Sequence, residues 1–287
     1  MSSPLKAGVI INIGSGGSDE DTGVRIAAIL REAGLPDARY WPVSGDELEG
    51  ALKEALFSGI DTLIVFGGDG TIRTAAAQST MDGPVLIPLP GGTMNLLPKA
   101  LYGDIGWEEV LRATLQNPMT RVISGGKVGK ERFFIAAVIG APALWAKARE
   151  AVRDGEIGVA LEEGKAALEK TFDSSVRYRF NELHEGTAEA ISVICPLIST
   201  TLADDRQVLE AAVVDVHGAG EVLQLATAAA FGQWRDAGNV AIVNTKSVIV
   251  SASSAIPLIL DGETINVGSS LEVEFVPEAF KVMVPAA

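Results

Sequence analysis

The sequence predicts two domains, an α/β domain built on a parallel sheet and then a domain of mainly antiparallel strands. In the first part of the chain, short apolar runs alternate with segments of helical periodicity, which is the pattern of successive βα units. In the second part, apolar and polar residues alternate over short segments with frequent turns, which is typical of an antiparallel β-sandwich. A length of 287 residues also favours two domains over one. We place the first domain at residues 1–118 and the second at residues 119–287.

The first βα unit begins with an apolar strand at residues 7–11 and a loop at 12–18. The segment after this loop has the apolar spacing of a helix, at Ile26, Ile29, Leu30 and Ala33. Ser18 and Asp21 form a capping-box pattern before this helix, and Ser44 with Glu47 repeats the pattern before a second one. Successive βα units require a parallel sheet with right-handed crossovers, so the loops that follow the strands lie at one edge of the sheet.

The clearest functional signal is an apolar strand at residues 62–66 that ends in Gly67-Gly68-Asp69-Gly70-Thr71. A strand, a glycine turn and a helix N-terminus in this order are typical of an anion-binding loop, because backbone N–H groups can approach phosphate oxygens closely. A carboxylate in such a loop would repel phosphate unless it binds Mg²⁺ or transfers a proton. We therefore predict metal-assisted phosphoryl transfer. In the alternative interpretation, the glycines serve only the turn and Asp69 caps the helix.

A second loop of the same kind follows the next strand. Residues 85–89 form an apolar run that continues into Pro90-Gly91-Gly92-Thr93-Met94-Asn95. Two neighbouring parallel strands place their following loops at the same carboxyl edge, where α/β proteins bind ligands. The sequence therefore predicts that both glycine loops face one site.

These residues resemble the diacylglycerol kinase catalytic-domain family, which includes sphingosine, ceramide and bacterial lipid kinases. The family's Gly-Gly-Asp-Gly-Thr motif is matched at residues 67–71 and its Pro-x-Gly-Thr-x-Asn motif at residues 90–95. Residues 12–16 are a weaker match to Asn-Pro-x-Ser-Gly, and residues 261–263 stand in the position of the family's Asp-Gly-Glu. The matches follow the family's order along nearly the whole chain.

The resemblance implies an NAD kinase/diacylglycerol kinase-like fold, with a Rossmann-like nucleotide-binding domain and a β-rich domain that carries the lipid. It implies an ATP-dependent lipid kinase of phospholipid metabolism that phosphorylates a hydroxyl group of a diacylglycerol- or sphingoid-like acceptor, with ATP and Mg²⁺ as cofactors. We expect Asp69 to act on the metal. The nucleotide-binding residues implied are Asn12, Ser15, Gly16, Gly67, Gly68, Asp69, Gly70, Thr71, Gly92, Thr93 and Asn95.

The implied catalytic residues are three carboxylates, Asp69, Asp261 and Glu263. We expect Asp69 to act through Mg²⁺ or its ordered water, since two anions in contact repel each other strongly in a desolvated cleft. Glu263, supported by Asp261, is our candidate for the general base that receives the proton of the acceptor hydroxyl. Which carboxylate is the base stays open. In the alternative interpretation, Asp261-Gly262 is only a hairpin turn, because Asp-Gly is a strong turn dipeptide.

The chain departs from the family directly after both glycine loops. The family's x-Asn-Glu is replaced by Ile72-Arg73-Thr74, and its Asp-Phe-Ala-Arg by Leu96-Leu97-Pro98-Lys99. The first change removes polar groups, although Arg73 could add a charge near phosphates. Two alternatives follow: a non-catalytic nucleotide- or lipid-binding protein on the same fold, and an NAD kinase-like enzyme, which shares the first glycine motif. The identity of the acceptor and the oligomeric state, including a possible homodimer, stay open.

The second domain is expected to contain strands and a few helices. Helices are expected at residues 107–115, which precede this domain, and at 143–153, 159–170 and 219–231. Strands are expected at residues 120–124, 127–128, 132–138, 176–180, 188–196, 208–216, 240–251, 256–260 and 271–276.

A composition of 47% apolar and 21% charged residues indicates a soluble globular protein, and the presence of one cysteine leads us to expect a cytoplasmic location. A net charge of −14 argues against nucleic acid as a partner, because phosphate backbones are bound by clustered Lys and Arg. The single Cys195 lies in an apolar run and fits a reducing compartment. Residues 7–13 are too short for a signal peptide, and the longest apolar stretch, 133–146, is too short to span a bilayer. We therefore expect any membrane contact to be peripheral.

Overall fold

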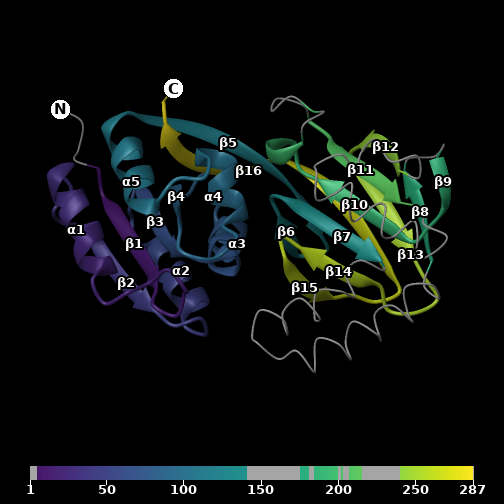
Figure 1. Cartoon of the computed structure of the whole chain (residues 1–287), viewed down its shortest axis with the longest axis horizontal. Coiled ribbons are helices and arrows are strands. Elements are labelled where there is room, and N and C mark those ends of the chain that lie inside the picture. Colours follow the sequence, from purple (N-terminus) through teal and green to yellow (C-terminus); the bar gives the residue numbers. More distant parts are fainter. Residues whose placement is uncertain are drawn as a thin grey trace. The chain divides into compact units, whose positions relative to one another are not determined.

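The computed structural model describes residues 5–140, 175–180, 184–199, 202, 207–214 and 240–286. The chain divides into two compact units, one formed by residues 1–125 with 276–287 and the other by residues 126–275. The first is an α/β unit with a parallel sheet and the second is an antiparallel β unit, which confirms the predicted fold class (Figure 1). The helices expected at 143–153, 159–170 and 219–231 lie outside the described residues.

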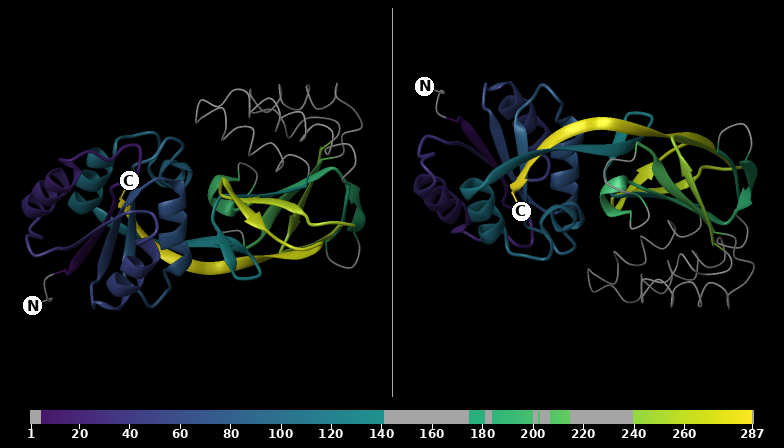
Figure 2. Two further views of the ribbon diagram at one scale, coloured as in Figure 1. Left: turned by 90° about the horizontal axis from the view of Figure 1, so that it is seen from below. Right: turned by 90° about the horizontal axis from the view of Figure 1, so that it is seen from above.

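The first unit contains four parallel strands in the order β2-β1-β3-β4, and the end of β16 lies beside β4. Helices α1 and α5 pack together on one face of the sheet, and α2 packs with α3 on the other (Figure 2). The strands of this unit are β1 (Ala7–Asn12), β2 (Arg39–Val43), β3 (Thr62–Gly67), β4 (Val85–Pro90) and part of β16 (Ser270–Pro285). The helices are α1 (Thr22–Glu32), α2 (Leu48–Phe57), α3 (Asp69–Gln78), α4 (Leu96–Tyr102) and α5 (Trp107–Gln116).

The core of the first unit follows from the sequence pattern. Strand β3 is buried at every position, as a central parallel strand covered on both faces must be. Alternate residues of β1, β3 and β4 pack against apolar residues of α1 and α5 in one cluster. No helix in the described part of the chain is long and apolar enough to cross a bilayer.

The second unit is a sandwich of two antiparallel sheets. One sheet has the order β12-β11-β10-β7-β14-β15, and the other contains β9, β8, β13 and the first part of β16. Apolar side chains from both sheets form one buried core. The remaining strands are β5 (Pro118–Val128), β6 (Glu131–Phe133), β7 (Ala136–Gly140), β8 (Val176–Phe180), β9 (His184–Ala188), β10 (Ala190–Ile194), β11 (Leu209–Val214), β12 (Val240–Thr245), β13 (Ser247–Ser251), β14 (Pro257–Leu260) and β15 (Glu263–Asn266).

Three parts of the strand prediction were wrong in their bounds. The strand expected at 132–138 is two strands, β6 and β7, because the intervening N–H groups of Phe134 and Ile135 donate to the Asp261 carboxylate. The strands expected at 120–124 and 127–128 are one strand, β5, because Gly125 and Gly126 do not form a turn. A Cβ atom at Gly126 would lie 2.2 Å from the ring of Phe133, so this glycine makes room for a buried aromatic side chain. The strand expected at 240–251 is two strands, β12 and β13, separated at Lys246, whose carbonyl accepts a hydrogen bond from the Phe275 N–H.

We expect Gly126→Ala to destabilise the protein by about 1–3 kcal/mol, because the added methyl group overlaps the Phe133 ring. Urea unfolding followed by fluorescence measures this loss. Gly45→Ala is the matched control, since a Cβ atom there has no neighbour within 4 Å. Equal stability of the two variants would contradict the packing role of Gly126.

Candidate functional site

The topology of the first unit brings three loops to one edge of its sheet. From β1 the chain moves to β2 on one side and then crosses to β3 on the other, so the strand order reverses between β1 and β3. In open α/β sheets, ligands bind outside the carboxyl ends of the strands at such a reversal. The loops at this edge are residues 12–21, 67–71 and 91–95, which we call the loop cluster.

Backbone hydrogen bonds join the three loops to one another. The Gly17 N–H donates to the Gly91 carbonyl at 2.8 Å, and the Gly91 N–H donates to the Gly67 carbonyl at 2.9 Å. The Asn12 side-chain amide donates to the Thr71 hydroxyl at 2.8 Å, and its carbonyl accepts the Gly14 N–H at 3.0 Å. The sequence-predicted residues of all three loops are therefore brought together.

The glycines of the loop cluster have two different roles. A Cβ atom would lie 2.6 Å from the Thr71 side chain at Gly67, 2.8 Å from the Phe66 ring at Gly91 and 2.7 Å from the Gly68 Cα at Gly92. These three glycines are required for the loops to pack. Gly16, in contrast, has no neighbour within 4 Å of such a Cβ atom. Packing alone therefore does not explain a glycine at this position.

Asp69 joins the second loop to the third. Its Oδ2 accepts the Asn95 N–H at 2.9 Å and its Oδ1 accepts the Leu96 N–H at 2.5 Å, which are the amides at the start of α4. Asp69 thus caps the helix after the third loop, whereas the alternative interpretation had it capping the helix that it begins. Each carboxylate oxygen has further lone pairs that these single bonds leave available.

Asn95 holds the third loop in a tight turn. Its backbone is left-handed, with φ 53°, a conformation that Asn tolerates better than most residues. Its side-chain amide forms two hydrogen bonds with the backbone of Gly92: it accepts one from the Gly92 N–H at 2.8 Å and donates one to the Gly92 carbonyl at 2.8 Å. The family-matched Asn therefore shapes the loop, and its own amide N–H is one of the two donors to Asp69.

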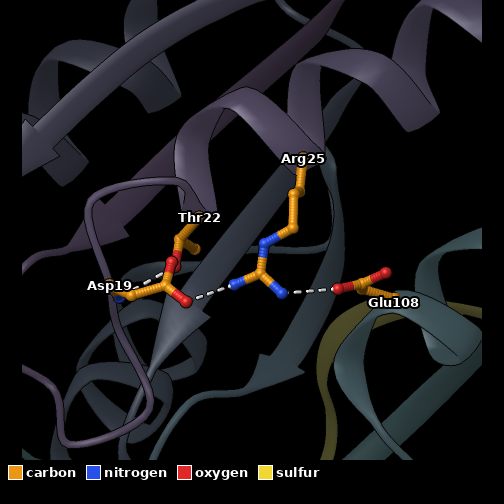
Figure 3. A network of polar contacts seen from close by, with 4 residues as sticks. All are labelled: Asp19, Thr22, Arg25 and Glu108. Atoms are coloured by element: carbon orange, nitrogen blue, oxygen red, sulfur yellow. Dashed lines mark hydrogen bonds and ion pairs between the residues drawn. The ribbon is translucent and has the colours of Figure 1, made fainter.

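The start of α1 differs from the prediction. The expected capping box of Ser18 and Asp21 is wrong, because the Thr22 hydroxyl donates to Asp19 Oδ1 at 2.7 Å and accepts the Asp19 N–H at 3.0 Å (Figure 3). The hydrogen bond from Thr22, and after it the bond from Arg25, lowers the pKa of the Asp19 carboxyl. The Ser44 and Glu47 pattern does form a bond, from the Ser44 N–H to Glu47 Oε2 at 2.9 Å.

The other two predicted carboxylates, Asp261 and Glu263, belong to the second unit. Asp261 is 6% exposed, with a left-handed φ of 49°. Its Oδ2 accepts the Phe134 N–H at 2.7 Å, and its Oδ1 accepts the N–H groups of Ile135 and Ala136 at 2.8 and 3.0 Å. Asp261 therefore fastens the turn between β14 and β15 to the start of β7. Glu263, two residues later, is exposed at the start of β15.

Several further side chains bear on the expected chemistry. Cys195 is buried. Its burial, and to a smaller extent the nearby charge of Asp261, raise the pKa of its thiol, so it behaves as a structural thiol.

Two residues at the positions that depart from the family motifs have local partners. Lys99 forms an ion pair with Asp104 at 3.2 Å, and the Thr74 hydroxyl donates to the Gly70 carbonyl at 2.8 Å. Among the residues that the structure describes, no group of three or more His, Cys, Asp or Glu side chains is arranged to hold a metal ion.

Comparison with known proteins finds a matching family model and a curated relative. Residues 6–128 match the model of the diacylglycerol kinase catalytic domain, which confirms the resemblance seen in the motifs. A curated relative, a probable lipid kinase YegS-like of Serratia proteamaculans (strain 568), is 33% identical over 144 residues, which are 49% of this chain and 46% of the relative. The match thus spans about half the length of that protein.

Solved structures resemble the chain over nearly its whole length. The crystal structure of a putative diacylglycerol kinase from Bacillus anthracis str. Sterne has a TM-score of 0.77 at 21% identity and covers 97% of this chain and 95% of its own. A diacylglycerol kinase structure from the same organism has a TM-score of 0.70 at 19% identity and covers 97% and 96%. At these identities the likeness shows that the fold is shared.

Proposed function

We propose that this protein is an ATP-dependent lipid kinase, since residues 6–128 match the model of the diacylglycerol kinase catalytic domain. In this proposal, it transfers a phosphoryl group to the hydroxyl group of a diacylglycerol- or sphingoid-like lipid. The observation that carries the proposal is the loop cluster, in which three glycine loops meet at the reversal point of the sheet around Asp69. Phosphoryl transfer depends mainly on positioning and on electrostatic stabilisation, which such a preorganised cluster can supply.

The nucleotide phosphates are bound by backbone N–H groups of the loop cluster. Gly16 supports this assignment, because the space beside it is open and its lack of a side chain would let phosphate oxygens come close. Thr93 is exposed in the third loop and offers a hydroxyl group to the same ligand.

Mg²⁺ fits this site through Asp69. Mg²⁺ is usually held by one or two carboxylates together with substrate phosphates and water. The two backbone bonds of Asp69 fix the position of its carboxylate, and the free lone pairs allow it to meet a cation. When bound, the ion supplies positive charge that neutralises the phosphates.

In the second unit, Glu263 is the general base and Asp261 positions it. Both oxygens of Asp261 are occupied by backbone N–H groups in a buried environment, so this residue suits a supporting role better than proton transfer. Glu263 is exposed and follows Asp261 by two residues, so the geometry that Asp261 fixes also sets the position of Glu263. An accessible carboxylate on a fastened turn is suited to accept a proton from a hydroxyl group.

The direct test is incubation of the protein with γ-labelled ATP, Mg²⁺ and a lipid extract, followed by separation of labelled lipids. We expect label in a lipid phosphate with the wild-type protein and much less with Asp69→Asn. Nucleotide binding without transfer to any lipid would favour the non-catalytic protein that the departures at residues 72–74 allow. Transfer to NAD in a parallel reaction would favour the NAD kinase-like alternative.

We expect ATP with Mg²⁺ to raise the melting temperature of the protein, because a ligand that binds only the folded state stabilises it by mass action. Free nucleotide at about 100 times its dissociation constant would stabilise the folded protein by about 2.7 kcal/mol. Differential scanning calorimetry with ATP, and with adenosine as the phosphate-free control, measures this effect. Equal shifts with both would show that the loop cluster does not bind the phosphates.

A further inference from the structure

Arg25 lies on α1, the helix that follows the first loop of the cluster, and forms ion pairs with two acidic side chains. Its Nη2 meets Asp19 Oδ2 at 2.6 Å, and its Nη1 meets Glu108 Oε1 at 2.7 Å (Figure 3). Asp19 belongs to the first loop of the cluster, Arg25 to the second turn of α1, and Glu108 to the first turn of α5. The guanidinium therefore connects the first loop to α5, whose Glu108 lies 83 residues after Arg25 in the sequence.

The same guanidinium is connected to the third loop through aromatic rings. Arg25 Cζ lies 5.1 Å from the ring centroid of Trp107, within the range of a cation–π contact. Trp107 packs edge-on against Phe66, with ring centroids 5.6 Å apart, and the Phe66 ring fills the space where a Cβ atom of Gly91 would lie. Gly91 in turn accepts the Gly17 N–H of the first loop. Arg25 thus supports the first loop directly and the third loop through its aromatic neighbours.

The mutual contact of Arg25 and Asp19 favours the charged form of both side chains. The hydrogen bond to Asp19 is the largest influence on Arg25 and raises the pKa of its guanidinium, while the bonds from Thr22 and Arg25 lower the pKa of Asp19. The three charged side chains are between 40% and 58% exposed, and ion pairs of such exposure contribute little to global stability. The main effect of the bridge is therefore expected on the local order of the loop.

The first loop needs such support because of its composition. It contains Gly14, Gly16 and Gly17, and glycine loses more backbone freedom on ordering than any other residue. If a loop becomes ordered only when its ligand binds, the free-energy cost of ordering the loop weakens the affinity for the ligand. A bridge that orders the loop beforehand therefore favours ligand binding.

We propose that Arg25 is a positioning residue that holds the first loop, through Asp19, in the conformation that binds the phosphates of the nucleotide. This inference rests on the proposed nucleotide-binding function of the loop cluster. Arg25 itself does not need to touch the nucleotide, because its two terminal nitrogens, Nη1 and Nη2, are directed to Glu108 and Asp19.

The test compares Arg25→Met and Arg25→Lys with Arg31→Met, an exposed residue on the same helix outside the bridge. Calorimetry with ATP and Mg²⁺ gives affinity, and hydrogen exchange of the nucleotide-free protein reports order in residues 13–19. We expect Arg25→Met to weaken ATP binding about 3- to 10-fold and to speed this exchange, in line with the loss of two ion pairs and a cation–π contact. Arg25→Lys should have an intermediate ATP affinity and exchange rate, since one ammonium group cannot reproduce the two contacts that the guanidinium nitrogens make with Asp19 and Glu108. Arg31→Met should match the wild type.

Kinetics add a readout that a purely structural role would not change. Arg25→Met should raise the KM for ATP while kcat in saturating ATP stays close to wild type. A lower melting temperature with unchanged affinity and unchanged loop exchange would overturn the inference. Failure of the wild-type protein to bind ATP would overturn the proposed function instead, and the exchange data would still decide whether Arg25 orders the first loop.

Discussion

Replacement of Glu263 by Gln is expected to lower kcat by about 10²- to 10⁴-fold, the usual contribution of a general base. The substitution keeps the size of the side chain and removes its ability to accept a proton. Glu263 is exposed and its backbone pairs with Leu260, so the hairpin of β14 and β15 should still form. The KM for ATP should change little, because the phosphates are assigned to the loop cluster. Steady-state kinetics with the lipid identified by labelling measure both parameters.

Two controls separate chemistry from structure in the second unit. Glu272→Gln changes another exposed carboxylate, on β16, and should leave kcat unchanged. Asp261→Asn places an amide nitrogen against backbone N–H groups, so it should cost about 2–4 kcal/mol of stability as buried hydrogen bonds to a charged group are lost. Near-wild-type kcat in Glu263→Gln, with the true acceptor, would assign the base to Asp69 or Asp261.

The parts of the fold that follow from local periodicity were predictable. Apolar runs such as residues 62–66 and 85–89 became β3 and β4, and the glycine segments after them became the loop cluster. These predictions succeed because a buried parallel strand and its following loop are encoded in adjacent residues. Gly67 and Gly92 were predicted as phosphate-binding positions, and that role stays a prediction. The structure shows in addition that a Cβ atom at either position would clash with a neighbour, which the sequence alone does not reveal.

The partners of the charged residues were not predictable in the same way. The Asp69 carboxylate accepts hydrogen bonds from two backbone N–H groups, which lie 26 and 27 residues later in the chain. Every residue type except proline has such a donor, so the sequence does not indicate these partners. The ion pair of Arg25 with Glu108 joins residues of two helices that meet only after folding. The bond between Asp19 and Thr22, in contrast, is local, and the spacing of these residues could have indicated it.

Gly126 shows why turn signals failed where tertiary packing dominates. A Gly-Gly pair commonly marks a turn, but here the strand continues and the missing side chain leaves room for the ring of Phe133.

The Asp261-Gly262 pair is both a hairpin turn and a site of tertiary contacts. It forms the turn between β14 and β15 with positive φ at both residues, and the Asp261 carboxylate also holds the amides at the start of β7. The folded structure was needed to show that both roles are present.

Replacement of Asp69 by Asn is expected to lower kcat about 10²- to 10³-fold, the scale seen when one preorganised electrostatic contact is removed. The structure adds a second expectation. Asn offers one acceptor where Asp69 offers two, so either the Asn95 N–H or the Leu96 N–H would lose its partner. We therefore expect a stability loss of about 1–3 kcal/mol as well. Urea unfolding measures this loss, and kinetics well below the melting temperature isolate the effect on kcat.

Asp61 provides the matched control for this substitution. It stands just before β3 as Asp69 stands just after it, and its Oδ2 likewise accepts a backbone amide, that of Lys6, at 2.9 Å. Asp61 lies at the amino end of the strand, away from the loop cluster, so Asp61→Asn should lower stability modestly and leave kcat unchanged. If Asp69→Asn loses stability in the same way but keeps full turnover, Asp69 is only the cap of α4. A loss of kcat confined to Asp69→Asn would instead support its action on Mg²⁺, because the two variants differ mainly in whether the charge lies beside the phosphates.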